Sequence, residues 1–257
     1  MTSGQRTAIV TGGLSGMGLA IARRLTRDGT TVFVGTRRAG DEAVVRDVLG
    51  SDAGSIQAAF LDVQSRESVD AFVAHVAAAR GGVDILVNAA GVYEEAGIID
   101  HPDKVWEDHI DTNLSGTFRM IRAVMPLMTR AGWGRIINLA SVAAHNGMAN
   151  NAAYCASKAG LLGLGRCVSL EGAAHGVTCV SISPTWVETE MLRRFIDADM
   201  KATGQTLEQV RADYARSNPQ NQLVQPSEVA ELAAFLASDA ARALTMEDYQ
   251  INAGSLW

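Results

Sequence analysis

Residues 7–18 read TAIVTGGLSGMG, a short apolar run followed by a turn that contains four glycines. The apolar run from Thr7 to Thr11 ends at glycine, which is typical of a buried β-strand. After the turn, apolar residues recur at helical spacing from Leu19 to Leu25, and Asp28 and Gly29 form a helix stop. The stretch therefore predicts a strand, a glycine-rich turn and a helix in immediate succession.

This succession is the setting in which a glycine-rich turn binds phosphate. Glycines let backbone N–H groups approach a pyrophosphate, and the N-terminus of the helix supplies positive potential. The spacing is Gly12-x-x-x-Gly16-x-Gly18, which differs from the pattern Gly-x-Gly-x-x-Gly. The alternative is a tight strand-to-helix turn without a ligand, but the flanking elements favour a bound cofactor.

Strands and helices alternate along the rest of the chain. Further strands are expected at 31–35, 55–61, 83–87, 134–141, 177–183 and 250–252, and helices at 40–49, 67–80, 101–113, 113–131, 151–174 and 226–237. The strand at 83–87 is nearly all apolar, as strands buried on both faces are. The regular alternation predicts an α/β fold with a parallel, doubly wound sheet.

The composition excludes several classes of function. The chain has 257 residues, of which 47% are hydrophobic and 19% charged, and its net charge is −6. These values are typical of a globular protein with a sizeable core. Without a long basic run, nucleic acid is not an expected partner. No apolar run reaches the roughly 18–20 residues of a membrane span, so no membrane partner is expected.

The cysteines and the N-terminus indicate a cytoplasmic protein. Cys155, Cys167 and Cys179 are twelve residues apart and form no Cys-x-x-Cys pair. They are expected to be buried thiols in a reducing compartment rather than disulfides or metal ligands. The first residues have no apolar core of the signal-peptide type.

The helix expected after residue 150 carries Tyr154 and Lys158, four positions apart. Residues at i and i+4 share one face of a helix, so the ammonium is expected close to the phenol. An isolated Tyr keeps its proton until about pH 10, and a neighbouring cation lowers that pKa. Such a phenol can donate and accept a proton, and Ser141 could hold the reacting oxygen. The alternative is a surface Tyr packed on the stem of a Lys.

Thr36, Arg37 and Arg38 follow the second strand, where a dinucleotide fold holds the adenosine ribose. A carboxylate there binds the 2′-hydroxyl of NAD, whereas arginine suits the 2′-phosphate of NADP. The sequence therefore favours NADP(H) over NAD(H), and the alternative is a solvated pair of surface arginines. Asp62 and Val63, at the end of the third strand, are positioned to meet the adenine.

Three further segments belong to the expected site. Small residues at 88–91 follow the fourth strand and let the backbone pass close to a ligand. Asn113 lies between two expected helices, where its side chain holds a water or, more simply, caps a helix. From about 188 to 218 an amphipathic insertion precedes the next core helix. We expect a substrate lid there, and the alternative is a peripheral helix pair that never moves.

With these motifs in order, the chain resembles the short-chain dehydrogenase/reductase family over essentially its whole length. The motifs that carry the resemblance are 11–18, 88–91, Asn113, Ser141 and Tyr154-x-x-x-Lys158. The resemblance implies a single Rossmann-like domain over residues 1–257, with a seven-stranded parallel sheet and a helical lid, assembled as a homotetramer. It also implies hydride transfer between a nicotinamide and a carbonyl or secondary alcohol.

The resemblance further implies roles for individual residues. Tyr154 is the acid/base, and Lys158 lowers its pKa and holds the nicotinamide ribose. Ser141 orients the substrate oxygen, and Asn113 holds the water of a proton relay. The cofactor residues that it implies, besides Tyr154 and Lys158, are Gly12, Leu14, Ser15, Gly16, Met17, Gly18, Arg37, Arg38, Asp62, Val63, Asn88, Gly91, Pro184, Val187 and Thr189.

The sequence departs from the family pattern at a few positions. Ala89 stands where a second Asn is common, and Thr185 where the family usually has Gly, beside the nicotinamide. Near the C-terminus, residues 245–247 and 254–255 replace Thr-Gly-Gln and Gly-Gly. These changes affect packing and the subunit contact there and leave the chemical centre intact.

The segment 184–187 and the lid resemble those of 3-oxoacyl reductases and 3-hydroxybutyrate dehydrogenases. The latter hold a substrate carboxylate with a His and a Lys at positions that are Ala143 and Asn151 here. Burying a carboxylate without such partners is costly, so a neutral or larger substrate is expected. The candidate pocket residues are Tyr93, His145, Met148, Trp186, Met191 and Leu192. Their alternative role is ordinary core and lid packing.

Three hypotheses for function follow. The first is an NADPH-dependent carbonyl reductase of the 3-oxoacyl or polyketide ketoreductase type. The second is an NAD(P)-dependent, catabolic secondary-alcohol dehydrogenase. The third is a non-catalytic, cofactor-binding regulator, which the retained Tyr154 and Lys158 disfavour. No Gly-x-Ser-x-Gly elbow indicates a hydrolase, and no His/Cys spacing indicates a metal.

Overall fold

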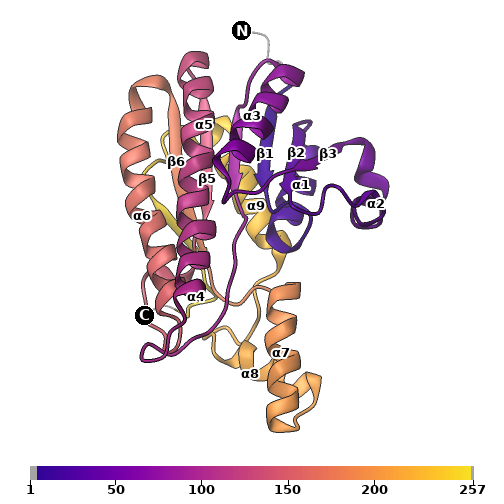
Figure 1. Ribbon diagram of the computed structural model, residues 1–257, viewed down its shortest axis with the longest axis vertical. Coiled ribbons are helices and arrows are strands. Elements are labelled where there is room, and N and C mark those ends of the chain that lie inside the picture. Colours follow the sequence, from indigo (N-terminus) through magenta and orange to yellow (C-terminus); the bar gives the residue numbers. More distant parts are fainter. Residues whose placement is uncertain (1–4, 256–257) are drawn as a thin grey trace.

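The computed structural model describes residues 5–255 and confirms the predicted parallel sheet with helices on both faces (Figure 1). The strands are β1 (Thr7–Thr11), β2 (Thr31–Thr36), β3 (Ile56–Phe60), β4 (Ile85–Asn88), β5 (Gly134–Leu139), β6 (Val177–Pro184) and β7 (Asp248–Ile251). The α-helices are α1 (Gly16–Arg27), α2 (Glu42–Leu49), α3 (Arg66–Arg80), α4 (Asp103–His109), α5 (Gly116–Ala131), α6 (Ala152–Gly172), α7 (Glu190–Thr203), α8 (Leu207–Arg216) and α9 (Pro226–Leu236).

The seven strands run parallel in the order β3-β2-β1-β4-β5-β6-β7. The chain begins in the middle of the sheet, builds outward to β3, and then crosses to β4 on the other side of β1. This reversal is a topological switch point, and ligands of open α/β sheets bind beyond the carboxyl ends of the strands there. The glycine-rich turn after β1 and the segments after β4 and β5 all lie at that edge.

Two apolar clusters fill the spaces between the sheet and its helices. Val10 and Val34 belong to the cluster on the side of α1 and α9, whereas Ile9 and Phe33 belong to the cluster on the side of α3 and α5. Successive side chains of a strand point to opposite faces, and both faces are covered. For this reason every residue of β1 is buried and its sequence is a continuous apolar run. Figure 1 shows α3, α5 and α6 in front of the sheet and α9 behind it.

The two helices expected at 101–113 and 113–131 form one continuous run. α4 passes into a π-helical turn at Ile110–Ser115, which passes directly into α5. The prediction that Asn113 lies between two separate helices was therefore wrong. Asn113 lies inside the π turn and caps no helix. Single π turns within longer helices occur mostly at functional sites.

The insertion expected at about 188–218 forms α7 and α8, which stand apart from the sheet at the lower end of Figure 1. A small cluster of buried apolar residues joins these helices to the segment that follows them: Leu192, Ile196, Val210 and Leu223. The two helices therefore have an apolar core of their own. Among residues 5–255 no helix is both long enough and apolar enough to cross a membrane.

Candidate active site

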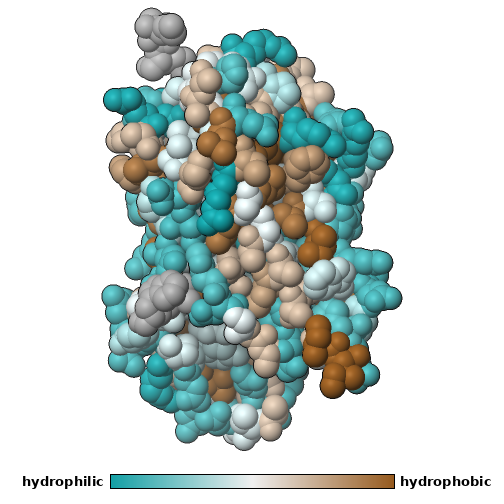
Figure 2. Space-filling view, turned by 90° about the vertical axis from the view of Figure 1, so that its left-hand side faces the viewer, coloured by the Kyte–Doolittle hydropathy of each residue, from teal (hydrophilic) through white to brown (hydrophobic). Residues whose placement is uncertain are grey.

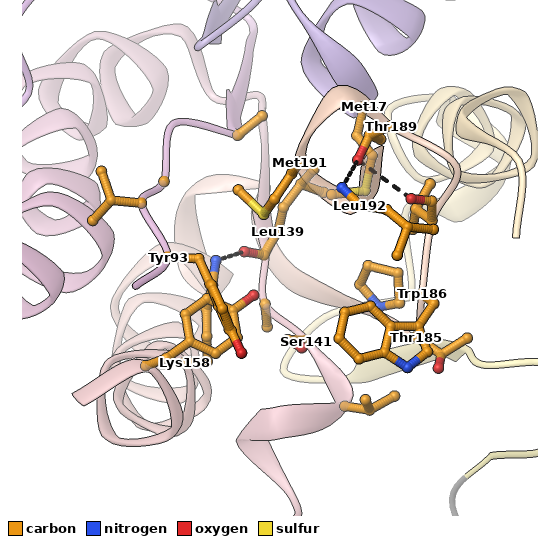
Figure 3. Close-up of a pocket in the computed structure, with 18 of the residues that line it drawn as sticks. Met17, Tyr93, Leu139, Ser141, Lys158, Thr185, Trp186, Thr189, Met191 and Leu192 are labelled. Carbon is orange, nitrogen blue, oxygen red and sulfur yellow. Dashed lines mark hydrogen bonds between the residues drawn. The ribbon is translucent and has the colours of Figure 1, made fainter. Parts of the chain in front are cut away.

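Ser141, Tyr154 and Lys158 line one cavity of about 180 Å³ at the carboxyl edge of the sheet (Figure 3). We call it the Tyr154 cavity. Ser141 lies two residues beyond the end of β5, and its hydroxyl oxygen accepts a hydrogen bond from the backbone N–H of Ala143, 3.1 Å away. Tyr154 and Lys158 lie in the first turns of α6. The structure therefore brings together, around one space, three polar groups that the sequence analysis selected.

Lys158 is buried, and its ammonium group has a backbone partner. Nζ donates a hydrogen bond to the carbonyl oxygen of Leu139 at 2.7 Å, and it lies 5.7 Å from the centre of the Tyr154 ring. Burial disfavours the charged form of an amine, and it lowers the pKa of Lys158 to about 8. The hydrogen bond to Leu139 fixes the direction of the side chain against the end of β5.

The pKa of Tyr154 differs from the expectation that Lys158 lowers it. Burial raises the pKa of the Tyr154 phenol, and the neighbouring Ser141 hydroxyl acts in the opposite direction. The physical reason is that desolvation disfavours a phenolate, while the ammonium is directed at a carbonyl rather than at the phenol. Burial is the larger influence, so the Tyr154 phenol keeps its proton at neutral pH.

Asn113 uses its side chain to hold two parts of the protein together. Its Oδ1 accepts a hydrogen bond from Val92 N at 2.8 Å, and its Nδ2 donates to Val92 O at 3.1 Å and to Ser157 Oγ at 3.0 Å. Both amide hydrogens are therefore occupied. The side chain therefore links the segment after β4 to α6, and its role in holding a water stays a prediction.

A second cavity, of about 210 Å³, lies at the same edge beside β1 and β2. We call it the Arg37 cavity. The predicted cofactor residues that line it are Gly12, Leu14, Ser15, Arg37, Arg38, Asp62, Val63 and Gly91. Arg38 donates a hydrogen bond to Leu14 O at 3.3 Å, which brings the arginine segment against the glycine-rich turn. The other predicted cofactor residues that line the Tyr154 cavity are Met17, Pro184, Val187 and Thr189.

The geometry of the glycine-rich turn fits a bound phosphate. A Cβ atom on Gly18 would lie 2.7 Å from the carbonyl oxygen of Gly12, so only glycine allows this close approach. The side chain of Ser15, at the N-cap of α1, makes no capping hydrogen bond. The first N–H groups of α1 are therefore available to an anion, which the helix dipole also favours. These residues suit a dinucleotide pyrophosphate.

Asn88 does not line either cavity. Its Nδ2 donates a hydrogen bond to Oδ1 of Asn138 at 2.9 Å, between the ends of β4 and β5. Asn88 is buried and its side chain joins two strands, so the expectation that Asn88 lies beside the cofactor stays a prediction.

Comparison with known proteins now decides the family, because the family model described as short chain dehydrogenase matches residues 6–199. The chain belongs to the short-chain dehydrogenase family. It is an oxidoreductase that acts between a ketone and a secondary alcohol. The family predicted from the motifs is thereby confirmed.

Curated relatives match this short-chain dehydrogenase over nearly its full length. A monensin polyketide synthase putative ketoacyl reductase from Streptomyces virginiae is 37% identical over 98% of this chain and 97% of its own. A D-beta-hydroxybutyrate dehydrogenase from Rhizobium meliloti is 38% identical over 97% of this chain and 98% of its own. A solved structure of a variant of actinorhodin polyketide ketoreductase with NADPH has a TM-score of 0.91 and 35% identity, and covers 98% and 97% of the two chains.

Five of the six substrate residues predicted for this short-chain dehydrogenase line the Tyr154 cavity, and one does not. Those that line the Tyr154 cavity are Tyr93, Met148, Trp186, Met191 and Leu192. Figure 3 shows Tyr93 beside Lys158, with Trp186 and Met191 on other sides of the same space. His145 is the exception. It lines a separate hollow between α6, β6 and β7, and its Nε2 lies 2.7 Å from Oδ2 of Asp248, because the turn after Ser141 directs it away from the cavity.

The structure adds residues to this short-chain dehydrogenase's site that the sequence analysis missed. Phe195, on α7, lines the Tyr154 cavity together with Val92, Val142 and Thr185. Its ring packs edge-to-face on Tyr93, with the ring centres 4.8 Å apart. Phe195 belongs to the apolar stripe of the insertion, but no sequence signal distinguishes it from Ile196, which packs inside the helix pair.

Proposed function

We propose that this short-chain dehydrogenase is an NADPH-dependent reductase that converts a ketone into a secondary alcohol. The observation that carries the proposal is the meeting of the Tyr154 cavity and the Arg37 cavity at Gly91 and Val92, which line both. One cavity holds a phenol and an ammonium, and the other holds two guanidinium groups. A dinucleotide held by both would supply a hydride when bound.

The proton chemistry follows from the burial of Tyr154. Reduction of a ketone needs a proton on the oxygen, and a buried phenol with a raised pKa holds that proton ready. We propose that Tyr154 gives its phenolic proton to the substrate oxygen while the Ser141 hydroxyl orients that oxygen. The Lys158 ammonium favours the phenolate that remains. Asn113 acts as a positioning residue, because it holds the Val92 backbone at the wall shared by the two cavities.

The preference for NADPH rests on charge. Arg37 and Arg38 are the cationic residues among those that line the Arg37 cavity, and both are exposed and able to reach a phosphate. Arginine binds phosphate through a planar fork of donors. The actinorhodin polyketide ketoreductase structure, of the same fold, holds NADPH. We therefore assign Arg37, with Arg38 beside it, to the 2′-phosphate, and the turn from Gly12 to Gly18 to the pyrophosphate.

The substrate that suits the Tyr154 cavity is an uncharged ketone with apolar groups. Lys158 is the charged residue among those that line it, and the rest of the lining is mostly apolar or aromatic. The Lys158 ammonium is already directed at the carbonyl oxygen of Leu139, and Ala143 and Asn151 stand where further cationic partners of a substrate carboxylate would be. Burying a poorly paired carboxylate is costly. Two relatives named as ketoacyl reductases fit this class.

The test measures NADPH oxidation with a panel of ketones. The readout is the loss of absorbance of the reduced nicotinamide. Tyr154→Phe should lower the turnover rate about 10²- to 10⁴-fold, as loss of a general acid does, while NADPH still binds. Tyr249→Phe, on β7 and outside both cavities, is the matched control and should keep the rate. Unchanged turnover in Tyr154→Phe would refute the mechanism.

A second candidate is an NAD(P)-dependent, catabolic secondary-alcohol dehydrogenase. The D-beta-hydroxybutyrate dehydrogenase relative, at 38% identity, favours this alternative. The same cavity and the same residues would then work in the direction of oxidation. Measuring kcat/KM for both cofactors in both directions separates the two, and a preference for NADH of about a hundredfold would overturn the assignment of Arg37 to a phosphate.

We also propose a cytoplasmic homotetramer with α7 and α8 as a lid. Exposed apolar side chains on α5 and α6, Phe118 and Leu170, support an interface between copies. Figure 2 faces the side of the molecule that carries α6 and shows apolar side chains gathered down its middle. The proposal of a lid rests on Met191, Leu192 and Phe195 of α7, whose side chains line the Tyr154 cavity.

A further inference from the structure

Asp248, the first residue of β7, holds two side chains from separate segments. Its Oδ1 accepts a hydrogen bond from Ser183 Oγ at 2.7 Å, and its Oδ2 lies 2.7 Å from His145 Nε2. A carboxylate only accepts hydrogen bonds, so Nε2 of His145 is the donor. The Asp248 side chain is 15% exposed and that of His145 21%. We call this arrangement the Asp248 clamp.

His145 connects the clamp to Ser141. The four residues between Ser141 and Asn146 form a tight turn, in which Ala143 N donates to Ser141 Oγ at 3.1 Å and His145 N donates to Val142 O at 3.0 Å. Ser141 begins this turn and His145 ends it. A fixed position for His145 therefore restricts where the Ser141 hydroxyl can lie.

Ser183 connects the clamp to the end of β6, beside the end of β5 that carries Ser141. It is fully buried in β6 and directly precedes Pro184, which lines the cavity together with Thr185. One carboxylate thus joins the turn that carries Ser141 to the strand end that carries Pro184. The strand bearing Asp248 is the edge of the sheet and pairs only with β6 among the strands of residues 5–255.

We propose that Asp248 is a positioning residue for the reduction, because it holds the turn after Ser141 against the end of β6, next to Pro184 in the lining of the Tyr154 cavity. The proposal rests on the proposed function, in which Ser141 orients the substrate oxygen. Hydrogen bonds to a carboxylate are stronger than neutral ones, and they gain further where water is largely excluded. A misplacement of about 1 Å near a reacting group can cost about 10²-fold in rate.

Asp248 itself is outside the reacting space. Together with His145 it lines the hollow between α6, β6 and β7, whose other charged residues are Arg166 and Glu247, and it does not line the Tyr154 cavity. An effect of Asp248 on turnover must therefore pass through the segments that it holds. This distinguishes the clamp from a residue that contacts the substrate.

The experiment measures turnover and amide exchange in three variants. Asp248→Ala should lower kcat about ten- to hundredfold with the KM for NADPH unchanged, since the Arg37 cavity is not touched. Asp248→Asn keeps the shape and one acceptor oxygen for Ser183, and its NH2 group can pair with His145 Nε2 once the imidazole proton moves to Nδ1. This variant should keep kcat within about threefold of wild type. Glu247→Ala, an exposed carboxylate in the same hollow, is the control and should behave as wild type. Deuterium exchange of amides 143–146 should rise in Asp248→Ala only.

A double-mutant cycle tests the route of the effect. If His145 acts through Asp248, the double variant of His145→Ala and Asp248→Ala should lose no more turnover than Asp248→Ala alone. If Asp248→Ala does not fold, the single variants His145→Ala and Ser183→Ala, which keep the carboxylate, test the clamp instead, and each should lower kcat and raise the exchange of amides 143–146.

The outcomes separate the clamp from the proposed function. Unchanged kcat and unchanged exchange in Asp248→Ala, in an enzyme that Tyr154→Phe inactivates, would overturn the clamp and leave the function standing. Effects of His145→Ala and Asp248→Ala that simply add would also overturn it. If wild-type protein reduces no ketone, the proposed function fails. The exchange of amides 143–146 then decides whether Asp248 holds the turn.

Discussion

Nζ of Lys158 lies 2.7 Å from the carbonyl oxygen of Leu139, at the end of β5, and 5.7 Å from the ring centre of Tyr154. The hydrogen bond ties α6 to the strand that delivers Ser141. The three side chains therefore keep their relative positions through a contact between a helix and a strand, not through the helix alone. The same contact leaves the ammonium buried, with one backbone partner and little water.

Burial of Lys158 gives the stability of the protein a particular pH dependence. Its pKa is about 8 when folded, against an ordinary value of 10.5. Between those values the unfolded chain holds a proton that the folded chain has released, so the free energy of unfolding rises with pH. The slope is at most about 1.4 kcal/mol per pH unit. Urea unfolding of the cofactor-free protein between about pH 8 and about pH 9.5 measures it.

The control for this prediction is a change of another lysine. Lys158→Met should lose the rise in stability, whereas Lys201→Met, exposed on α7, should keep it. Above pH 10 the raised pKa of Tyr154 acts in the opposite direction, because the folded state then binds the extra proton. Equal slopes in both lysine variants would contradict the burial argument.

Arg37→Ala tests the cofactor assignment. Loss of a hydrogen-bonded charge partner costs about 1.5–3 kcal/mol, which is about ten- to hundredfold in affinity. We expect kcat/KM for NADPH to fall by that factor and kcat/KM for NADH to change little, because NADH has no 2′-phosphate. Arg46→Ala, exposed on α2, is the matched control. A parallel loss for both cofactors would mean that Arg37 serves the fold or the turn instead.

Gly18→Ala tests the close approach in the glycine-rich turn. The added Cβ would lie 2.7 Å from the backbone oxygen of Gly12, which cannot move as a side-chain end can. The N-terminus of α1 must shift, so the affinity for the dinucleotide should fall by more than tenfold. The fluorescence of the reduced nicotinamide measures this binding. Gly82→Ala meets no atom within 4 Å and should bind normally. Normal binding by Gly18→Ala would show that the turn does not hold the pyrophosphate.

Phe195→Ala tests which substrates the Tyr154 cavity accepts. The Phe195 ring packs on Tyr93 and lies 6.1 Å from the Trp186 ring, so its loss enlarges the apolar cavity. Small ketones lose their packing contacts with the Phe195 ring, whereas ring-bearing ketones fill the space that the ring leaves. The ratio of kcat/KM for a bulky ketone to that for a small one should rise about tenfold. Phe235→Ala on α9 should leave the ratio unchanged, and an unchanged ratio in Phe195→Ala would remove Phe195 from the site.

Patterns within a few residues of the sequence account for most of the fold. The glycine turn between β1 and α1, the apolar run of β4 and the alternation of elements predicted the parallel sheet that the structure has. The predicted boundary between two helices at Asn113 failed, because a π turn keeps helical periodicity while adding a residue to one turn. Periodicity alone cannot detect that change.

The sequence by itself determined which elements form and that Tyr154 and Lys158 share a face of α6, because helical and strand periods are local properties. Only the tertiary structure decided how deeply those groups are buried and which side chains they contact. Ser157, the partner of Asn113, is 44 residues away along the chain, and Asp248, the partner of His145, is 103 away. The direction of the Tyr154 pKa also depended on burial by distant segments. Desolvation and side-chain pairing arise from contacts between elements, which no local pattern contains.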